Sequence, residues 1–445
     1  MSRKTFRKRL LVGLGVTLLV VSLSTFALAA CPSATSLRGK TVYLAMLSVP
    51  GIPEALSHVG EFEKETGIKI NIEMLPEKTL REKTTADLAF GTGIYDALMF
   101  GLMYVTPYAE GNMLMPLNQF VDSEDPSYLN RIKINDYIPR ALEVNSYGGN
   151  LYGLPFYAES SFHFYRKDLF AQAGLFEPRS LDDIWNAAEK LTNKPNLYGI
   201  IMRGIRGGGL NVYTWTSWLW AYGGKYFDDD MKPVLDSPEA IASVKAYADI
   251  LKAYGPSGVA GFDWSVVSTY ATEGKTAQFY DATPFVSMIE ADTSSTKGKW
   301  GIVVPTEIKS PAGSFAPTIY TWSFGMSAHA GEPWATWRFI SWLTGYEMSE
   351  KLISEGFTFA GALSRKSQVD EHPDTAKTYW AAKTLDALAK APLDFRPRIK
   401  EWPAVGDAIG AALSEVIAGQ NTASTAFKAV NKQVYRIMER AGAYK

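Results

Sequence analysis

The side chains with the most evident chemical use are aromatic rings that recur near predicted turns and strand ends. They are Tyr152, Phe156, Tyr157, Tyr213, Trp215, Trp218, Trp220, Tyr280, Trp322 and Trp402. A flat aromatic face can pack against the C–H face of a sugar, while carboxylates, amides and guanidinium groups hydrogen-bond its hydroxyl groups. Because large rings also dominate protein cores, core packing is the alternative for each of these residues.

The motifs that would indicate phosphate binding, metal binding or nucleophilic catalysis are incomplete. Gly39 and Gly274 each precede a Lys-Thr pair, but Ala34 and Thr269 stand where a P-loop has its first glycine. The four histidines are too scattered to form a helix-borne metal pair. The cluster Gly207-Gly208-Gly209 is more typical of a flexible turn than of a phosphate site. We therefore expect no catalytic residue, no metal and no cofactor.

The single cysteine, Cys31, ends a segment typical of export. Five basic residues precede an uncharged stretch from Leu10 to Phe26, and Leu28-Ala29-Ala30-Cys31 resembles a bacterial lipobox. Ala27-Leu28-Ala29 would instead serve an ordinary signal peptidase, and a retained membrane anchor is a third interpretation. An unpaired cysteine in an oxidising compartment favours lipidation. We expect residues 1–30 to be a signal peptide, and Cys31 to carry a lipid that attaches the exported protein to a membrane.

The composition of the remaining chain indicates a large globular protein without disulfides. Hydrophobic residues make up 47% of the sequence and aromatic residues 13%, which is ample for extensive cores. About 415 mature residues exceed the size at which a single core stops growing, so at least two lobes are expected. Loss of the five basic residues before Leu10 lowers the formal net charge from −1 to −6. A mildly acidic surface argues against nucleic acid as a partner.

Alternating strands and helices predict an α/β fold with a mostly parallel sheet. The predicted strands are residues 41–47, 68–74, 95–101 and 198–202, and the predicted helices are 57–65, 237–254, 332–343, 375–389 and 422–441. The helix over 237–254 has the clearest signals: Ser237 can cap it, Pro238 suits its first turn, and it ends at Gly255.

Several motifs together resemble the extracellular solute-binding proteins of sugar ABC importers. They are the helix-to-strand passage Phe62 to Ile70, the strand start Tyr95 to Leu98, and the segments Leu151 to Ser161 and Phe164 to Phe170. The last two are similar to the point where the family's chain crosses between its lobes, and the resemblance covers nearly the whole mature chain.

Other motifs are similar to the branch of this family that binds sugar alcohols. They are Leu80 to Asp87, Tyr198 to Ile200 with Arg203-Gly204, Lys232 to Glu239, and Tyr280 to Thr283. One departure is Ser323-Phe324-Gly325 after Trp322, because that branch usually has another tryptophan there.

The resemblance implies a two-lobe α/β fold of the periplasmic-binding-protein type (type II-like), with the ligand in a cleft between the lobes. One lobe would be residues 37–153 plus 323–358, and the other 156–320 plus 364–445. Three crossovers would lie near Leu154, Tyr320 and Ala360. It also implies a monomer that captures a sugar or sugar alcohol and delivers it to the transmembrane subunits of an ABC permease. Hinges of a few residues suit such closure.

Three charged residues and one ring are the main candidates for the ligand site. The resemblance places Glu159 at the first crossover, where it would accept hydrogen bonds from ligand hydroxyls; a solvated loop carboxylate is the alternative. Asp281 follows a predicted strand end and would act likewise, unless it caps a helix over 283–290. Arg203 offers a fork for two vicinal hydroxyls, or else a structural salt bridge with Glu159 or Asp281. Trp322 is the best stacking candidate.

Four further residues are expected to contribute. Asn211 and Tyr213 would add contacts from the same lobe as Arg203, and Arg81 and Tyr104 from the other lobe. Trp402 belongs either to the core or to the rim of the cleft.

Two other functions fit parts of this pattern. Paired carboxylates in an aromatic cleft also describe glycosidases, although no feature sets one carboxyl as the acid and another as the nucleophile. A binding protein that serves a sensory receptor would have the same sequence features.

Overall fold

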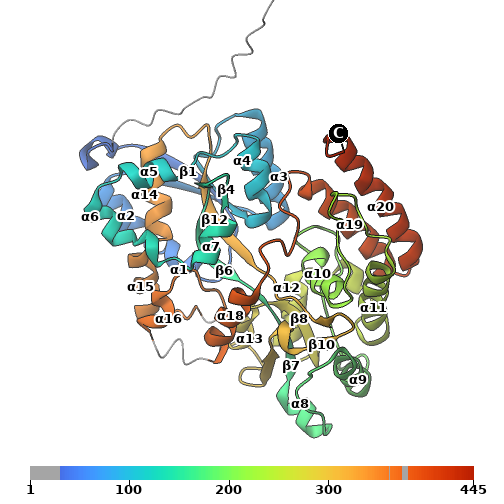
Figure 1. Cartoon of the computed structure of the whole chain (residues 1–445). Coiled ribbons are helices and arrows are strands. Elements are labelled where there is room, and N and C mark those ends of the chain that lie inside the picture. Colours follow the sequence, from blue (N-terminus) through green and yellow to red (C-terminus); the bar gives the residue numbers. More distant parts are fainter. Residues whose placement is uncertain (1–30, 360, 373–378, 445) are drawn as a thin grey trace, which may run out of the picture.

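The structure of the protein, a computed structural model, describes residues 31–359, 361–372 and 379–444. The predicted signal peptide, the alternative of a retained membrane span, the crossover at Ala360 and the start of the helix expected from Thr375 lie outside these residues. Two β-sheets with surrounding helices occupy different parts of the molecule (Figure 1).

The larger sheet has five strands in the order β2-β1-β3-β12-β6. Its strands are β1 (Thr41–Met46), β2 (Lys69–Met74), β3 (Ala97–Gly101), β6 (Leu154–Glu159) and β12 (Tyr320–Met326). The first three are parallel, whereas β12 runs antiparallel to both β3 and β6. The register between β12 and β6 shifts between Trp322 and Ser323. Pro155, which has no N–H group to donate, lies at this irregularity.

The smaller sheet has three strands in the order β8-β7-β9. They are β7 (Ser161–Arg166), β8 (Gln278–Ala282) and β9 (Trp300–Val303), and both pairings are antiparallel. Only Ser160 separates β6 of the larger sheet from β7 of the smaller one. The short pairs β4 (Ser146–Tyr147) with β5 (Asn150–Leu151) and β10 (Lys309–Ser310) with β11 (Gly313–Ser314) complete the strands of the described residues.

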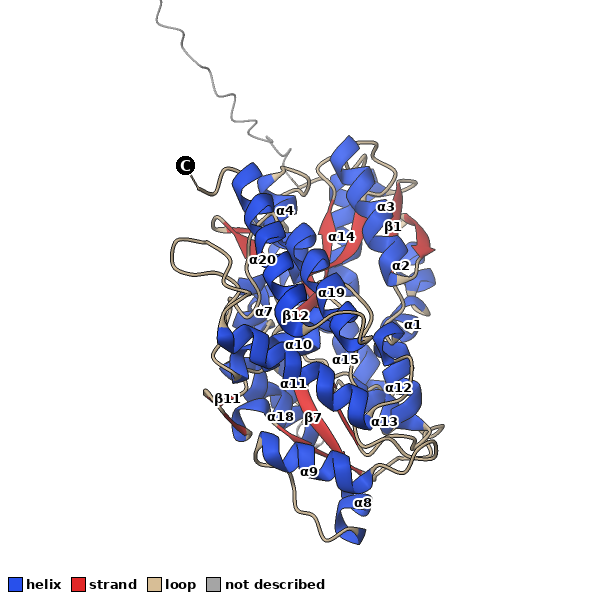
Figure 2. Cartoon of the chain, turned by 90° about the vertical axis from the view of Figure 1, so that its right-hand side faces the viewer, coloured by secondary structure: helices blue, strands red, loops and turns tan. Residues whose placement is uncertain are grey.

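Helices cover the sheets and build much of the part beside the smaller sheet (Figure 2). In chain order they are α1 (Ile52–Leu56), α2 (Val59–Thr66), α3 (Glu77–Phe90), α4 (Val105–Glu110), α5 (Asn118–Ser123), α6 (Pro126–Ile132), α7 (Pro139–Val144), α8 (Lys167–Gln172), α9 (Leu181–Leu191), α10 (Asn211–Ala221), α11 (Pro238–Tyr254), α12 (Trp264–Thr272), α13 (Phe285–Ile289), α14 (Pro333–Leu343), α15 (Tyr346–Ser354), α16 (Ser367–Asp370), α18 (Tyr379–Lys390), α19 (Trp402–Ile417) and α20 (Ala423–Arg440). Helix α14 packs on the larger sheet, and α10, α11, α19 and α20 pack together.

Most of the predicted elements are confirmed, and two expectations are wrong. The helix over 237–254 is α11, and Ser237 caps it by accepting a hydrogen bond from the N–H of Ala240. Residues 198–202 form only isolated bridges, Tyr198 to Thr276 and Ile201 to Phe279, and not a strand. The sheets are also not mostly parallel, since parallel pairing is confined to β1, β2 and β3 among the named strands.

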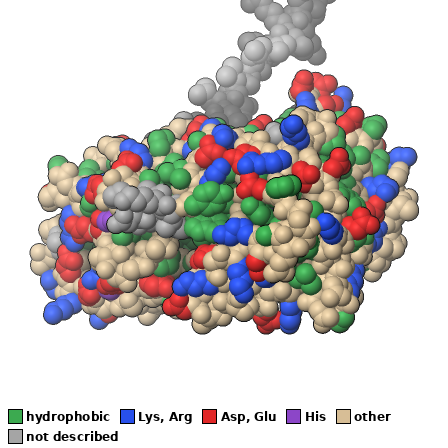
Figure 3. Space-filling model, turned by 90° about the horizontal axis from the view of Figure 1, so that it is seen from below, with side chains coloured by type: hydrophobic (Ala, Val, Ile, Leu, Met, Phe, Trp, Pro, Cys, Tyr) green, Lys and Arg blue, Asp and Glu red, His purple; other side chains and the backbone are tan. Residues whose placement is uncertain are grey.

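The surface carries charges of both signs. On the face drawn in Figure 3, acidic and basic side chains are interspersed, a pattern that gives no strong field of one sign. Among the helices of the described residues, none combines the length and the apolar character needed to cross a membrane.

Candidate ligand-binding site

A cavity lies between the loops and strand ends of the two sheets. It encloses about 550 Å³ of space free of protein atoms, part of it open to solvent. From the side of the larger sheet it is lined by Leu47, Val49, Pro50, Glu77, Arg81, Tyr157, Glu159, Tyr320 and Trp322. From the side of the smaller sheet it is lined by Arg203, Gly209, Tyr213, Trp264, Ala282, Pro284, Phe285 and Met288. Its size and its mixture of rings and few polar groups suit a small organic ligand.

Glu159 is the one lining carboxylate that has no hydrogen-bond partner among the described residues. It is the last residue of β6, and only 6% of its surface is exposed. Burial raises the pKa of its carboxyl to about 8, although nearby Arg203 acts in the opposite direction. Its two oxygens are not fully enclosed, because they face the cavity. Hydroxyl groups of a ligand would supply the missing hydrogen bonds.

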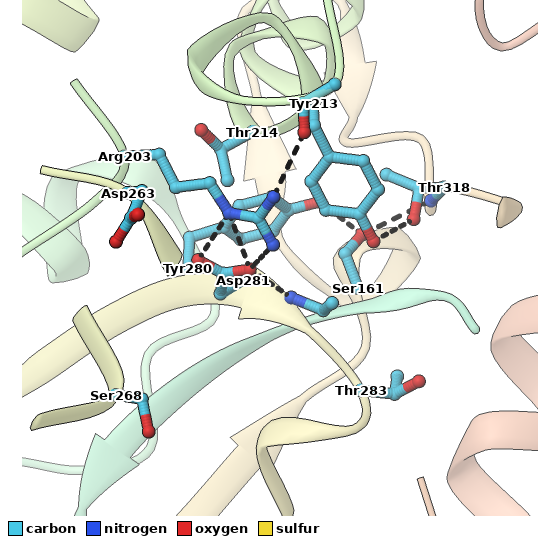
Figure 4. Close-up of polar contacts among 12 residues, drawn as sticks. Ser161, Arg203, Tyr213, Thr214, Asp263, Ser268, Tyr280, Asp281, Thr283 and Thr318 are labelled. Atoms are coloured by element: carbon cyan, nitrogen blue, oxygen red, sulfur yellow. Dashed lines mark hydrogen bonds and ion pairs between the residues drawn. The ribbon is translucent and has the colours of Figure 1, made fainter. Parts of the chain in front are cut away.

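Arg203 and Asp281 form a buried ion pair at the opposite wall (Figure 4). Nε of Arg203 lies 3.0 Å from Oδ2 of Asp281, and Nη2 donates to Oδ1. The N–H of Ala282 also donates to Oδ1, at 2.7 Å. Burial alone would lower the pKa of Arg203, but Asp281 raises it overall, so the guanidinium stays charged. Arg203 lines the cavity, while Asp281 lies behind it with none of its surface exposed.

A second arginine enters the cavity from the larger-sheet side. Glu77 and Arg81 lie one turn apart on α3 and form a salt bridge. Nη2 of Arg81 also donates to the Tyr320 hydroxyl at 3.3 Å, and Nη1 contacts Sδ of Met103 at 3.1 Å. The guanidinium lies 5.7 Å from the centre of the Trp322 ring. These contacts fix the side chain of Arg81 from several directions.

The aromatic wall comes from alternate positions of two neighbouring strands. Tyr157 and Glu159 share one face of β6, and Tyr320 and Trp322 share the same face of β12, because side chains of a strand alternate between its faces. Tyr320 lies over Gly101 of β3, where an added Cβ would be 1.6 Å from the hydroxyl oxygen. The glycine therefore makes room for this ring.

Tyr213 joins this wall from α10 on the other side. Its ring lies 6.2 Å from that of Tyr320, and its hydroxyl donates to the backbone oxygen of Ser160 at 3.0 Å. Thr318 lies 2.9 Å from the same hydroxyl oxygen (Figure 4). The hydroxyl is thus bonded to the segments that connect the two sheets, while the guanidinium groups of Arg203 and Arg396 lie over the ring, 4.7 and 5.4 Å from its centre.

Of the residues predicted for the site, Glu159, Arg203, Trp322, Tyr213 and Arg81 line the cavity, and three others do not. Asp281 is behind Arg203, and it does not cap α13, which has no side-chain cap. The amide of Asn211 is buried and donates to the backbone oxygens of Gly204 and Gly410. Tyr104 stacks on Tyr108 beneath Arg81.

Several of the other aromatic candidates belong to the core instead. Trp215 and Trp218 are at most 1% exposed and lie on α10. Trp402 is also buried, and its ring packs edge-on against Tyr226. Core packing, which was the alternative for each ring, is therefore the role of these three.

Sequence reasoning missed lining residues that carry clear local signals. Glu77 stands four positions before Arg81, a spacing that predicts an ion pair on a helix. Trp264 follows Asp263, whose side chain accepts hydrogen bonds from the N–H groups of Ser265 and Val266 and so begins α12. Tyr320, Phe285 and Met288 reach the cavity only through tertiary packing.

The arrangement suits binding of hydroxyl groups better than glycoside hydrolysis. Glycosidases need two carboxyl groups that flank the scissile bond. Here Glu159 faces the cavity without a partner, whereas the carboxylates of Asp281 and Glu77 are each engaged by an arginine. No cluster of three metal-ligating side chains occurs among the residues that the structure describes.

The parts of this chain that match known proteins include strands of both sheets. The sequence pattern of a family described as bacterial extracellular solute-binding protein matches residues 51–350. A mannitol-binding protein of Pseudomonas aeruginosa is 28% identical over 410 residues, which cover 87% of this chain and 90% of the relative. A solute-binding protein of an ABC transporter from Agrobacterium vitis, solved with bound D-mannitol, has a TM-score of 0.82 and 26% identity and covers 91% of this chain and 100% of its own. Another from Agrobacterium radiobacter, in complex with ribitol, has a TM-score of 0.81 and 26% identity and covers 90% and 99%.

Proposed function

The chain belongs to the bacterial extracellular solute-binding protein family, and from this membership we propose that it captures a sugar alcohol outside the cell and delivers it to an ABC permease. The two solved structures named above hold D-mannitol and ribitol. Both are linear, uncharged polyols, a ligand class that agrees with the polar groups and rings of the cavity.

The observation that carries this proposal is the set of complementary groups around the cavity. Glu159 offers carboxyl oxygens that can accept hydrogen bonds, and Arg203 and Arg81 offer N–H donors. Both guanidinium groups are already paired with a carboxylate. A neutral ligand therefore fits without leaving either arginine uncompensated, and Trp322 would supply an apolar face for its C–H groups.

Capture would proceed by closure of two lobes, 37–153 plus 323–358 and 156–320 plus 364–445. Ser160 is the single residue between β6 and β7, so little backbone needs to rotate there. Closure would remove water from both sides of the ligand and present a shape that a permease can distinguish from the open form.

Titration calorimetry of the purified protein with ribitol, D-mannitol, D-sorbitol and maltose tests this function. We expect heat of binding with at least one of the three polyols and full recovery of unaltered ligand after prolonged incubation. Binding of maltose alone would overturn the polyol assignment. Release of reducing sugar from glycosides would instead favour a carbohydrate-active enzyme.

A further inference from the structure

The glycine loop at residues 207–209 lies where Arg81 of the larger-sheet side comes close to the backbone of the smaller-sheet side. The loop precedes α10, on the side of the smaller sheet, and Gly209 lines the cavity. Its three glycines suggested only a flexible turn in the sequence. The surroundings of each one show that the loop is tightly fixed.

Helix α19 supports the loop from one side. An added Cβ on Gly410 would lie 2.4 Å from the backbone nitrogen of Gly207, and one on Gly406 would lie 2.9 Å from Cα of Gly208. Distances below 3.0 Å to backbone atoms cannot be relieved by a side-chain rotation. The two glycines, spaced four residues apart on one face of α19, therefore let the loop backbone sit directly on the helix.

Two buried arginines hold the carbonyl groups of the loop. Nη1 of Arg203 donates to the oxygen of Gly209 at 3.2 Å, and Nη1 of Arg396 donates to the oxygen of Gly208 at 3.0 Å. Arg396 is 4% exposed, and its guanidinium lies over the rings of Tyr213 and Tyr320. Hydrogen bonds from arginines of the same side therefore hold the loop backbone, so the loop cannot easily move away from the larger-sheet side.

The remaining face of the loop contacts the larger-sheet side. An added Cβ on Gly209 would lie 2.8 Å from Nη2 of Arg81, and one on Gly208 would lie 3.5 Å from Cε of Met103. The guanidinium of Arg81 is not free to swing away, because Glu77, Tyr320 and Met103 bind it. A β-carbon at position 209 would therefore require the Arg81 guanidinium to shift and to disturb these contacts.

We propose that the loop 207–209 is a closure contact, at which glycine in position 209 allows the guanidinium of Arg81 to seat against the backbone of the opposite lobe. This inference rests on the proposed capture by lobe closure. It assigns Gly209 and Gly208 as positioning residues that set the closed geometry. Neither of them needs to bind the ligand through a side chain.

The Gly209→Ala variant tests the contact, with Gly261→Ala as the matched control, since an added Cβ there meets no atom within 4 Å. We expect Gly209→Ala to weaken polyol binding at least about tenfold and to prevent the decrease in radius of gyration that ligand causes in small-angle X-ray scattering. The control should behave as the wild type. Circular dichroism and thermal unfolding check that both variants fold. Wild-type affinity and compaction in Gly209→Ala would overturn the proposal.

A double-mutant cycle with Arg81→Ala identifies the clash as the cause. Arg81→Ala removes the guanidinium, so adding Gly209→Ala to it should change affinity by less than about twofold. An equal, additive loss in both backgrounds would contradict the contact with Arg81.

A measurement without ligand separates this proposal from the proposed function. In a Cys31→Ser background, a short bifunctional thiol reagent should join the two positions of the Arg81→Cys/Gly209→Cys variant, as detected by mass spectrometry, and it should not join either single variant. Cross-linking of this variant, together with no polyol binding by the wild-type protein, would overturn the ligand assignment and support the contact. Polyol binding by the wild-type protein, with no cross-linking of the double-cysteine variant in the presence or absence of ligand, would support the ligand assignment and overturn the contact.

Discussion

We predict that Glu159 determines how the cavity distinguishes one polyol from another, because it is the lining carboxylate without a partner among the described residues. Removing a partner of a buried hydrogen bond costs about 1 to 3 kcal/mol, and more where the partner is charged. We predict that Glu159→Ala weakens binding at least about tenfold, equivalent to about 1.4 kcal/mol. It should also change the ranking among stereoisomeric hexitols, since directional bonds sense hydroxyl configuration. Trp322→Ala should weaken all ligands alike. Calorimetry that shows unchanged affinity and ranking would contradict this role.

The affinity should depend on pH through the same side chain. The pKa of Glu159 is raised to about 8 by burial, while Arg203 lowers it and Asp281 and Glu77 raise it. Ligand hydroxyls that donate to the carboxylate stabilise its ionised form and therefore lower the pKa in the complex. Binding then releases a proton below about pH 8, so affinity rises with pH up to about pH 8 and levels off above. Titrations in buffers of different ionisation enthalpy measure this proton, and Glu159→Gln should abolish it.

Asp281 acts through Arg203. Removing one partner of a buried ion pair leaves an uncompensated charge and costs about 3 to 5 kcal/mol. Asp281→Ala should therefore lower the midpoint of urea unfolding and weaken binding together, because Arg203 loses the group that orients it. Lys245→Ala, which breaks the exposed pair with Asp249, is the control and should change stability by less than about 0.5 kcal/mol. Full stability of Asp281→Ala would contradict the structural importance of this pair.

At the scale of elements, Thr283 connects two of the segments that lie between the sheets. Its hydroxyl accepts from the N–H of Ser160 at 3.1 Å and donates to the oxygen of Gly361. Thr283→Val keeps the shape but leaves both groups without their partner, which should cost about 1 to 3 kcal/mol in urea unfolding. Thr269→Val, at an exposed position of α12, should be nearly neutral. Equal effects of the two substitutions would show that the junction does not depend on this hydroxyl.

Local signals predicted the elements well where they were strong. Ser237, Pro238 and Gly255 delimit α11 in sequence and in structure. The strand expected at 198–202 is wrong. Only Tyr198 and Ile201 pair with other residues there, through isolated parallel bridges to Thr276 and Phe279. Helix α10 was not predicted, since its polar and apolar residues are buried alike around the helix and leave no apolar stripe.

The candidate site was predictable only in part, because tertiary packing decides which side chains face the cavity. Glu159 and Arg203 stand at chain positions that the crossover motif and a strand end mark. Whether a side chain faces the cavity or supports another one depends on packing. Asp281 and Arg203 have similar sequence signals, yet only Arg203 reaches the cavity. Tyr320 required Gly101, which is 219 positions away in the chain.

At the scale of the whole molecule, the N-terminal end of the described chain belongs to the larger-sheet side. Sγ of Cys31 lies 3.2 Å from Oε1 of Glu124 and 3.6 Å from Nη2 of Arg338 on α14. Glu124 is in turn paired with Arg338. A lipid on Cys31 would therefore hold this side close to the membrane, and the smaller-sheet side would be the part that moves on closure.

We predict that the mature protein begins at Cys31 and carries a diacylglycerol thioether on this residue. The thioether cannot donate to Glu124, but Arg338 still neutralises that carboxylate, so lipidation leaves no uncompensated buried charge. Mass spectrometry of protein from its native membranes should show the lipid mass, and Cys31→Ala should shift the protein to the soluble fraction. Burial and the hydrogen bond with Glu124 raise the pKa of a free thiol here, so an unmodified protein would react slowly with maleimide. An N-terminus at Ala30 with such a thiol would mean that ordinary signal peptidase releases a freely diffusing protein.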